Sequence, residues 1–239
     1  MEIKRQLRKL NNKQIAEDIK EYIKSSHTFY ETKVPELNIL AKRLHEEYSL
    51  EEFYRVFNRF WKSGYRDKMS LAIYTLRLYE EDFDLGTWSF IRPRLREMKS
   101  WDKIDDVGSD IIGKILLKYP ILESEIIRMV DSGNKWFIRM GIMSTIPLIK
   151  KSYIRLGIGF AEMHVHDNDE HIQKAVGMIL YEIGQVRPET AKRFILKNIH
   201  MPLITFNYAT QDMKELRALR RIKKLNYNGF GRLMFWRYE

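Results

Sequence analysis

The amino-acid sequence predicts an all-α protein, and three observations lead to that fold class. Apolar residues recur at three- and four-residue spacing along nearly the whole chain, as at Phe57, Phe60 and Trp61, and this is the period of one helix face. No run of useful length alternates apolar and polar residues in the manner of a half-buried strand. Gly and Pro are sparse, with 12 and 6 in 239 residues, which favours long helices. One helical run, over residues 110–119, is expected to stop at Pro120.

A layout that recurs every 34 or 35 residues refines this class. Four segments place a polar turn before a helix that has a small residue near its start, and they span residues 63–76, 99–112, 132–145 and 167–180. When the four segments are aligned, with a shift of one residue allowed, their equivalent positions lie 35, 34 and 35 residues apart. One such set of equivalent positions is Ser70, Asp105, Arg139 and Lys174. Close approach of neighbouring helices is expected at the small residues Ala72, Gly108, Gly141 and Gly177.

A helix pair repeated at this period predicts a right-handed α-solenoid of HEAT-like helix pairs, folded as a single curved domain. No linker rich in Pro, Ser and Gly interrupts the series. We therefore expect one repeat domain over residues 1–215, followed by a basic, aromatic-rich tail over residues 216–239. In such a slab the second helix of each pair lines the concave side, so Asp105 is expected there beside a basic row that includes Arg139 and Lys174.

Positive charge is concentrated at the two ends of the chain. The formal net charge is +10; residues 1–13 carry five Lys or Arg against one Glu, and residues 212–239 carry eight against three acidic residues. Such an excess suits a polyanion partner, because each neutralised phosphate releases condensed counterions. A protein that is basic without such a partner is the alternative, since charge alone names no function. For the tail, nucleic-acid contact, packing on the last repeat and binding of a partner all remain open.

The composition also limits the chemistry and the compartment. The chain contains no Cys, which excludes disulfides, thiolate nucleophiles and Cys-ligated zinc. No apolar run approaches the roughly 20 residues that span a bilayer, and the first residues lack the apolar core of a secretory signal. We expect a cytoplasmic protein. The cluster HVHDNDEH at residues 164–171 follows no standard zinc spacing and falls at an expected turn, so no metal or cofactor is predicted.

Four Asp and a Trp crowd the stretch SWDKIDDVGSDI at residues 100–111, in a chain that is otherwise basic. Ser100 can cap a helix here, and Asp102 fits the first turn, where an acid complements the macrodipole. Asp105 lies beyond that turn, so the dipole explains it less well. Because Trp101 and Asp105 are four residues apart, they share one helix face, and a second pair, Asp102 and Asp106, lies on an adjacent face. The acid-rich stretch thus has two interpretations at this point, the chemistry of a helix start and a place for a positively charged group.

Several motifs, taken in order, resemble the AlkD-type DNA alkylation repair glycosylase family of HEAT-like repeat proteins. The resemblance covers about residues 15–210, and its most specific part is KSWDKID at 99–105 followed by IIGKILLKYP at 111–120. Further parts are W-x-x-R from Trp136 to Arg139, IQKAVGMILYEIG at 172–184 and MPLITFNYA at 201–209. The family's opening helix, with an aromatic residue thirteen positions ahead of a Pro, is matched by Tyr22 and Pro35.

This resemblance implies roles for individual residues. The family's catalytic carboxylate falls on Asp105 and its essential Trp on Trp101. Its early aromatic falls on Tyr22, and the Arg that helps to hold the DNA backbone falls on Arg139. One position departs from the family pattern, because Met178 stands where the family has a second Trp on its concave face. A Met can pack against a sugar or a base but has no aromatic face.

The implied activity is that of a monofunctional DNA glycosylase, which hydrolyses the N-glycosidic bond of positively charged N3- or N7-alkylated purines in duplex DNA and leaves an abasic site. Bond cleavage builds oxocarbenium character on the sugar, which a carboxylate stabilises and a nearby indole supports by cation–π attraction. The expected partner is double-stranded DNA carrying alkylated bases. We expect the protein to act as a monomer and to need no membrane. A non-catalytic HEAT-repeat scaffold that binds DNA or protein is the alternative, and Met178 favours it.

Overall fold

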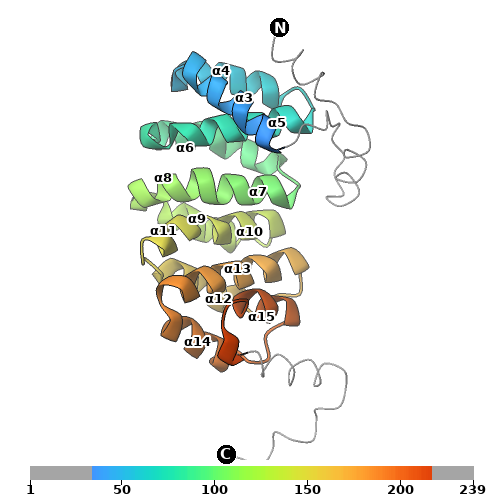
Figure 1. Cartoon of the computed structure of the whole chain (residues 1–239), viewed down its shortest axis with the longest axis vertical. Helices are drawn as coiled ribbons and strands as arrows, with labels where there is room; N and C mark the ends of the chain where they lie inside the picture. The colour runs from blue at the N-terminus through green and yellow to red at the C-terminus, as the bar shows by residue number, and fades with distance from the viewer. Residues whose placement is uncertain (1–33, 217–239) are drawn as a thin grey trace, which may run out of the picture. The chain divides into compact units, whose positions relative to one another are not determined.

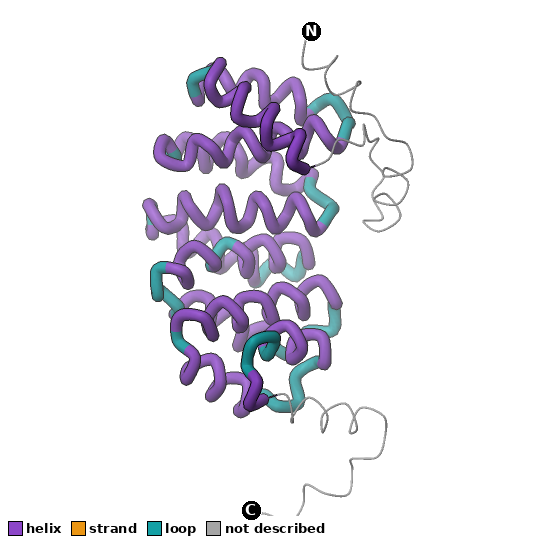
Figure 2. The backbone as a smooth tube through the Cα atoms, viewed as in Figure 1, coloured by secondary structure: helices purple, strands orange, loops and turns teal. Residues whose placement is uncertain are grey.

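The computed structural model describes residues 34–216, and its contacts divide the chain into two compact units, Met1–Glu123 and Ser124–Glu239. Each unit is described by itself. Every regular element within residues 34–216 is helical and none is a strand, which confirms the predicted all-α class (Figures 1 and 2). None of the helices in this range is both long and apolar enough to cross a membrane. The solenoid and the division at residue 215 stay predictions.

The first unit is built from short helices joined by tight turns. Its elements are α3 (Val34–Glu47), α4 (Leu50–Trp61), α5 (Arg66–Leu76), η1 (Arg77–Asp82), α6 (Leu85–Ile91), η2 (Arg92–Glu97), α7 (Trp101–Val107), η3 (Gly108–Ile112), α8 (Gly113–Lys118) and η4 (Pro120–Leu122). Helices α3, α4 and α7 all pack against α5, whose middle is fully buried. Helix α8 ends at Lys118, two residues before Pro120, as the sequence predicts.

Two capping boxes set where helices of the first unit begin. At α4 the Ser49 hydroxyl accepts from the Glu52 backbone N–H, and the Glu52 carboxylate accepts from the Ser49 backbone N–H at 3.0 Å. At α6, Asp84 and Thr87 make the same reciprocal pair. These contacts satisfy N–H groups that the first helical turn leaves without an intrahelical acceptor.

The second unit is organised around one long helix. Its elements are α9 (Glu123–Val130), α10 (Lys135–Met143), α11 (Ile146–Lys150), α12 (Arg155–His164), α13 (Glu170–Val186), α14 (Pro188–Lys197), α15 (Leu203–Ala209) and η5 (Lys214–Leu216). Helices α10, α11, α12, α14 and α15 all pack against α13 (Figure 1). The face of α13 that they cover is apolar, from Ile172 to Ile183, so burial of this face holds the unit together.

Polar contacts between helices join residues about one sequence repeat apart. In the first unit Trp61 donates its indole N–H to Glu97, 36 residues on, at 2.6 Å, and Tyr54 bonds Thr87 at a separation of 33. In the second unit the ring of His164 bonds the carbonyl of Val130 at a separation of 34. These contacts therefore join helices that lie about one 34–35-residue period apart in the sequence.

Two of the small residues singled out by the sequence stand where helices come closest. A Cβ added to Gly177 of α13 would lie 2.5 Å from the Tyr208 Cβ and 2.9 Å from the Thr205 carbonyl oxygen, both on α15. A Cβ on Gly141 of α10 would lie 2.4 Å from a methyl group of Val130. The prediction of close helix approach is confirmed at both glycines.

Gly177→Ala is expected to lower the free energy of unfolding by about 1–3 kcal/mol, because the new methyl group meets backbone that cannot move aside. The matched control is Gly159→Ala in α12, where an added Cβ meets nothing within 4 Å. The control is expected to gain about 0.5–1 kcal/mol from the better helix propensity of Ala. Urea unfolding of both variants provides the measurement, and equal midpoints would contradict the close packing of α13 on α15.

Candidate functional site

Helix α7 carries the candidate catalytic residues. Trp101 and Asp105 are both half-buried and lie one turn apart on the same face of this helix. Ser100 occupies the N-cap position with extended backbone, but its side chain makes no capping hydrogen bond, so the suggestion that Ser100 caps the helix is wrong. Contacts from outside α7 must therefore hold its first turn.

An ion pair with α5 provides that hold. The guanidinium of Arg66 donates a hydrogen bond to the carboxylate of Asp102, and the two side chains are only 11% and 20% exposed. The expectation that Asp102 is structural is confirmed, although an inter-helix ion pair accompanies the first-turn position that suggested it. Because Asp102 lies between Trp101 and Asp105 in sequence, this pair fixes the turn that carries both candidate residues.

A buried lysine lies beside this ion pair. Lys103 is 2% exposed, and its Nζ is 3.8 Å from the Asp102 carboxylate but donates no hydrogen bond to another described residue. Burial and, to a smaller extent, the positive charge of Arg66 lower the pKa of Lys103 to about 7, against the opposite effect of Asp106 and Asp67. The amine is therefore partly neutral near neutral pH.

Asp106 is the next carboxylate on α7, and it also has an unusual environment. Burial raises the pKa of Asp106 to about 6, and the neighbouring charges of Asp110 and Asp105 act in the same direction. The positive charges of Arg77 and Lys103 oppose this shift. Asp106 thus changes charge close to the pH at which a cell operates.

A π-helical turn follows directly after the candidate residues. Within η3 the Ser109 hydroxyl is 2.9 Å from the carbonyl oxygen of Asp105, to which it donates, and 2.9 Å from the Asp110 carboxylate. Turns of this kind insert one extra residue into an α-helix and occur frequently at functional sites. Here the turn separates the polar half of the helical run, α7, from its apolar half, α8.

The remaining candidate residues belong to the second unit, apart from Tyr22, which lies outside the described residues. Arg139 of α10 is 3% exposed and donates a hydrogen bond to the carbonyl oxygen of His171. Lys174 pairs with Glu170 at 3.2 Å on the surface of α13, and Met178 follows one turn later, half-buried. Helix α13 therefore brings Lys174 and Met178 to one stretch of surface.

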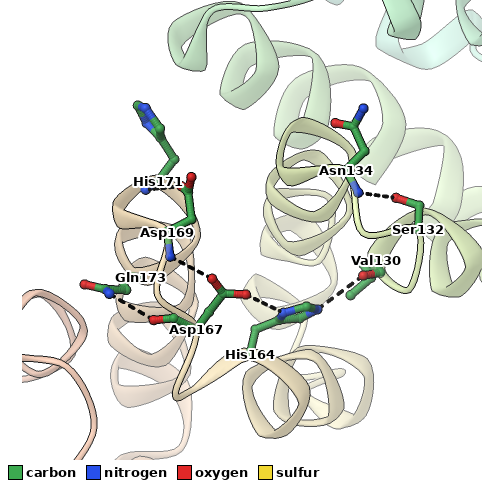
Figure 3. A network of polar contacts seen from close by, with 8 residues as sticks. All are labelled: Val130, Ser132, Asn134, His164, Asp167, Asp169, His171 and Gln173. Atoms are coloured by element: carbon green, nitrogen blue, oxygen red, sulfur yellow. Dashed lines mark hydrogen bonds and ion pairs between the residues drawn. The ribbon is translucent and has the colours of Figure 1, made fainter.

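The segment of residues 164–171 forms a structural turn between α12 and α13 (Figure 3). The His164 ring lies between the Asp167 carboxylate and the Val130 carbonyl oxygen, at 3.2 Å from each. Asp167 in turn accepts from the Asp169 backbone N–H, and Asp169 accepts from the N–H of His171 to cap α13. Among residues 34–216, no group of three or more His, Asp or Glu side chains is arranged to hold a metal ion.

The N-terminal ends of α10 and α13 are joined by further contacts around His171. Lys135 pairs with Asp169 at 3.3 Å, and its ammonium group lies 4.9 Å from the centre of the Trp136 ring. The Trp136 and His171 rings are 4.8 Å apart between centroids. Burial lowers the pKa of His171, which favours its neutral form beside these cations.

Comparison with known proteins adds a family and a fold. Residues 3–213 match the sequence model of a family described as DNA alkylation repair enzymes. The chain is also similar to the solved structure of a predicted DNA alkylation repair enzyme from Enterococcus faecalis, with a TM-score of 0.72 and 16% identity, over 86% of this chain and 97% of that one. At this identity the likeness concerns the fold. No curated protein sequence matches the chain.

Proposed function

The chain belongs to the AlkD-like family of DNA alkylation repair enzymes, and on this basis we propose that it is a monofunctional DNA glycosylase. The reaction is hydrolysis of the N-glycosidic bond of a positively charged N3- or N7-alkylated purine in duplex DNA, which leaves an abasic site. The observation that carries the proposal is the pair Trp101 and Asp105 on one face of α7, whose first turn is tied to α5 by the Arg66–Asp102 ion pair.

The reaction needs few catalytic groups, because the alkylated base already carries a positive charge and is therefore a good leaving group. As the bond to the sugar lengthens, positive charge builds on the deoxyribose, much as in glycoside hydrolysis. A carboxylate at Asp105 stabilises that charge and can orient the attacking water. The indole of Trp101 adds a cation–π contact worth about 0.5–2 kcal/mol, depending on how far water is excluded.

We further propose that the helix pairs form a right-handed solenoid whose concave side receives the DNA, with the lesion held at the duplex surface. Tyr22, Lys174 and Met178 would contact the substrate, and the positive charge of the chain supports duplex binding. Arg139 is proposed to hold the DNA backbone. In the structure this side chain is 3% exposed and donates to the His171 carbonyl oxygen, so contact with a phosphate requires the guanidinium to turn outward when DNA binds.

A binding protein without catalysis is the second candidate, favoured by one observation. Met178 replaces the aromatic residue that the family places on the substrate-facing surface. Without that ring, the protein would hold duplex DNA and not break the glycosidic bond. The presence of both Trp101 and Asp105 favours the glycosylase over this candidate.

The experiment that separates the two incubates purified protein with duplex DNA containing a single 7-methylguanine and measures the free base released. A glycosylase is expected to release 7-methylguanine far above the spontaneous rate and to leave an unmodified duplex intact. A duplex with a neutral damaged base serves as the matched substrate control, because a site selective for cations should ignore it. Binding of all three duplexes without release from the cationic one would support the scaffold instead.

A further inference from the structure

Two rows of cationic side chains follow helix α4 and the stretch formed by α6 and η2, and we refer to them together as the α4–η2 basic face. All six members are exposed, and they are Arg55, Arg59, Lys62, Arg92, Arg96 and Lys99. The first three lie on α4 or cap its C-terminal end, and the last three lie on η2 or just after it. Each residue of the second row follows its counterpart in the first by 37 residues, so both rows have the same spacing.

Contacts between side chains hold the two rows next to each other. The Trp61 indole N–H of α4 donates to the Glu97 carboxylate of η2 at 2.6 Å, and the Tyr54 hydroxyl is 2.9 Å from that of Thr87. The rings of Tyr54 and Phe90 are stacked, with 4.0 Å between their centroids. Helix α4 and the α6–η2 stretch therefore lie side by side (Figure 1), and the two rows belong to one surface.

The α4 part of this face points away from the interior of the first unit. Helix α4 packs against α5, and its buried residues include Phe53 and Phe57. Two residues along an α-helix turn the side-chain direction by about 200°, so Arg55 and Arg59 lie opposite these two rings. None of the six cations belongs to α7, which carries the candidate catalytic pair, so the basic face is a separate surface.

The positive charge of this face is not balanced locally. Residues 50–62 and 85–99 contain seven Lys or Arg against three Glu, a net charge of +4. Two of these three acids have other roles, because Glu52 belongs to the capping box of α4 and Glu97 accepts from the Trp61 indole. The surplus on these two stretches is therefore free to attract an anion.

Five of the six cations also differ from lysines elsewhere on the chain. No ion pair with another of residues 34–216 is made by Arg55, Arg59, Lys62, Arg96 or Lys99. By contrast, Lys114 pairs with Glu80 at 2.9 Å, and Lys192 pairs with Glu215 at 2.7 Å. Like charges gathered on one surface repel each other, and an anionic partner relieves that repulsion when it binds.

We propose that the α4–η2 basic face binds the phosphate backbone of a DNA duplex, at a place separate from Trp101 and Asp105. Residues four and seven apart on α4 are separated by about 6 and 10 Å along its axis, close to two and three nucleotide steps of one DNA strand. Guanidinium groups suit phosphates, because they can donate two parallel hydrogen bonds to the oxygens. The inference goes beyond the proposed function, since this contact does not depend on release of a base.

An anionic membrane is the other extended partner that a basic surface can meet, but this face lacks apolar anchors. Helices that lie on membranes combine their cations with exposed aliphatic or aromatic side chains that enter the lipid. Within α4, α6 and η2 the one exposed large apolar residue is Leu85, 42% exposed at the first position of α6 and away from η2. The face therefore fits a partner that is recognised by charge, as the backbone of a duplex is.

The test measures how affinity for an undamaged duplex depends on salt concentration, by fluorescence anisotropy. The double variant Arg59→Gln with Arg96→Gln removes one charge from each row. Its slope of log affinity against log salt should be smaller than that of the parent by about 2, because each lost phosphate contact removes about 0.9. The matched control, Lys114→Gln with Lys192→Gln, removes the same total charge from paired lysines and should keep the slope of the parent.

Two further variants separate binding from structure. Arg59→Lys with Arg96→Lys keeps both charges and should keep the slope of the parent, whereas a structural role for the guanidinium groups would make it behave like the Gln variant. Lys62→Gln with Lys99→Gln removes charges at the ends of the rows and repeats the test where thermal unfolding shows that the first variant has lost structure. A parent-like slope in the folded Gln variants, or an equal loss in the control, would overturn the proposal. Gln variants that keep this slope and lose binding to phosphatidylserine vesicles would also overturn it, because the partner would then be a membrane.

Base release distinguishes failure of this inference from failure of the proposed function. With saturating protein, single-turnover release of 7-methylguanine should be the same for the parent and for Arg59→Gln with Arg96→Gln. A reduced salt slope in a protein that releases no base would support the basic face and exclude the glycosylase. Base release with an unchanged slope would keep the glycosylase and exclude the basic face.

Discussion

Asp105→Asn is expected to lower the rate of base release from 7-methylguanine DNA by about 10²–10³-fold, the scale of effect seen when one group that stabilises transition-state charge is removed. Asn keeps the shape of Asp but carries no charge, so it can neither offset the positive sugar nor orient water as a base. Single-turnover kinetics with excess protein gives the chemical step directly, and fluorescence anisotropy gives the affinity for the duplex.

The variant should not lose duplex affinity, because it removes a negative charge from a surface that we propose binds a polyanion. The control is Asp131→Asn, which removes an exposed carboxylate just after α9 and should leave the release rate at the parent value. A release rate in Asp105→Asn within a few-fold of the control would exclude this carboxylate from the mechanism.

The largest loss of stability is expected from Arg66→Met, at about 3 kcal/mol, because it leaves Asp102 in a mostly buried place without its ion-pair partner. The loss should be smaller below pH 7, where protonated Lys103 can partly neutralise Asp102. Urea unfolding followed by circular dichroism at pH 6 and pH 8 measures both effects.

The double variant Arg66→Met with Asp102→Leu provides the matched comparison. Replacing both partners of a buried pair by apolar residues is often nearly neutral, so this protein should regain most of the lost stability. A double variant no more stable than Arg66→Met alone would show that the ion pair does not hold α7. The rate of base release by a stable double variant would then show how strongly catalysis depends on the position in which the ion pair holds α7.

Sequence reasoning predicted the parts of the fold that depend on local pattern. Helical spacing alone was sufficient for the all-α class, and Pro120 ends its helix because a ring without an N–H cannot continue the ladder. The repeat alignment identified Gly141 and Gly177, where an added Cβ would lie 2.4 Å and 2.5 Å from a side-chain atom of a neighbouring helix. These predictions succeed because the spacing of apolar residues and the backbone properties of Pro and Gly are visible in the sequence itself.

The burial and the charged surroundings of a side chain were harder to predict than the helix on which it lies. Lys103 looks like a surface residue in the sequence, yet the packing of α7 on α5 buries it. Arg66 could have been noticed, because it precedes Asp102 by 36 residues, about one repeat. Asp106 carried no signal of its own, since its raised pKa comes from burial and from charges that the fold assembles. The roles of Trp101 and Asp105 themselves remain predictions.

The π-helical turn at residues 108–112 affects how an extra residue is accommodated between the candidate site and the buried helix α8. A π turn closes i→i+5 hydrogen bonds, so it takes up one more residue than an α-helical turn for about the same rotation. The face that presents Trp101 and Asp105 therefore keeps its direction relative to the buried face of α8 although the chain is one residue longer. Deletion of Ser109 is expected to leave that direction in place while removing the hydroxyl that bonds the Asp105 carbonyl oxygen and the Asp110 carboxylate.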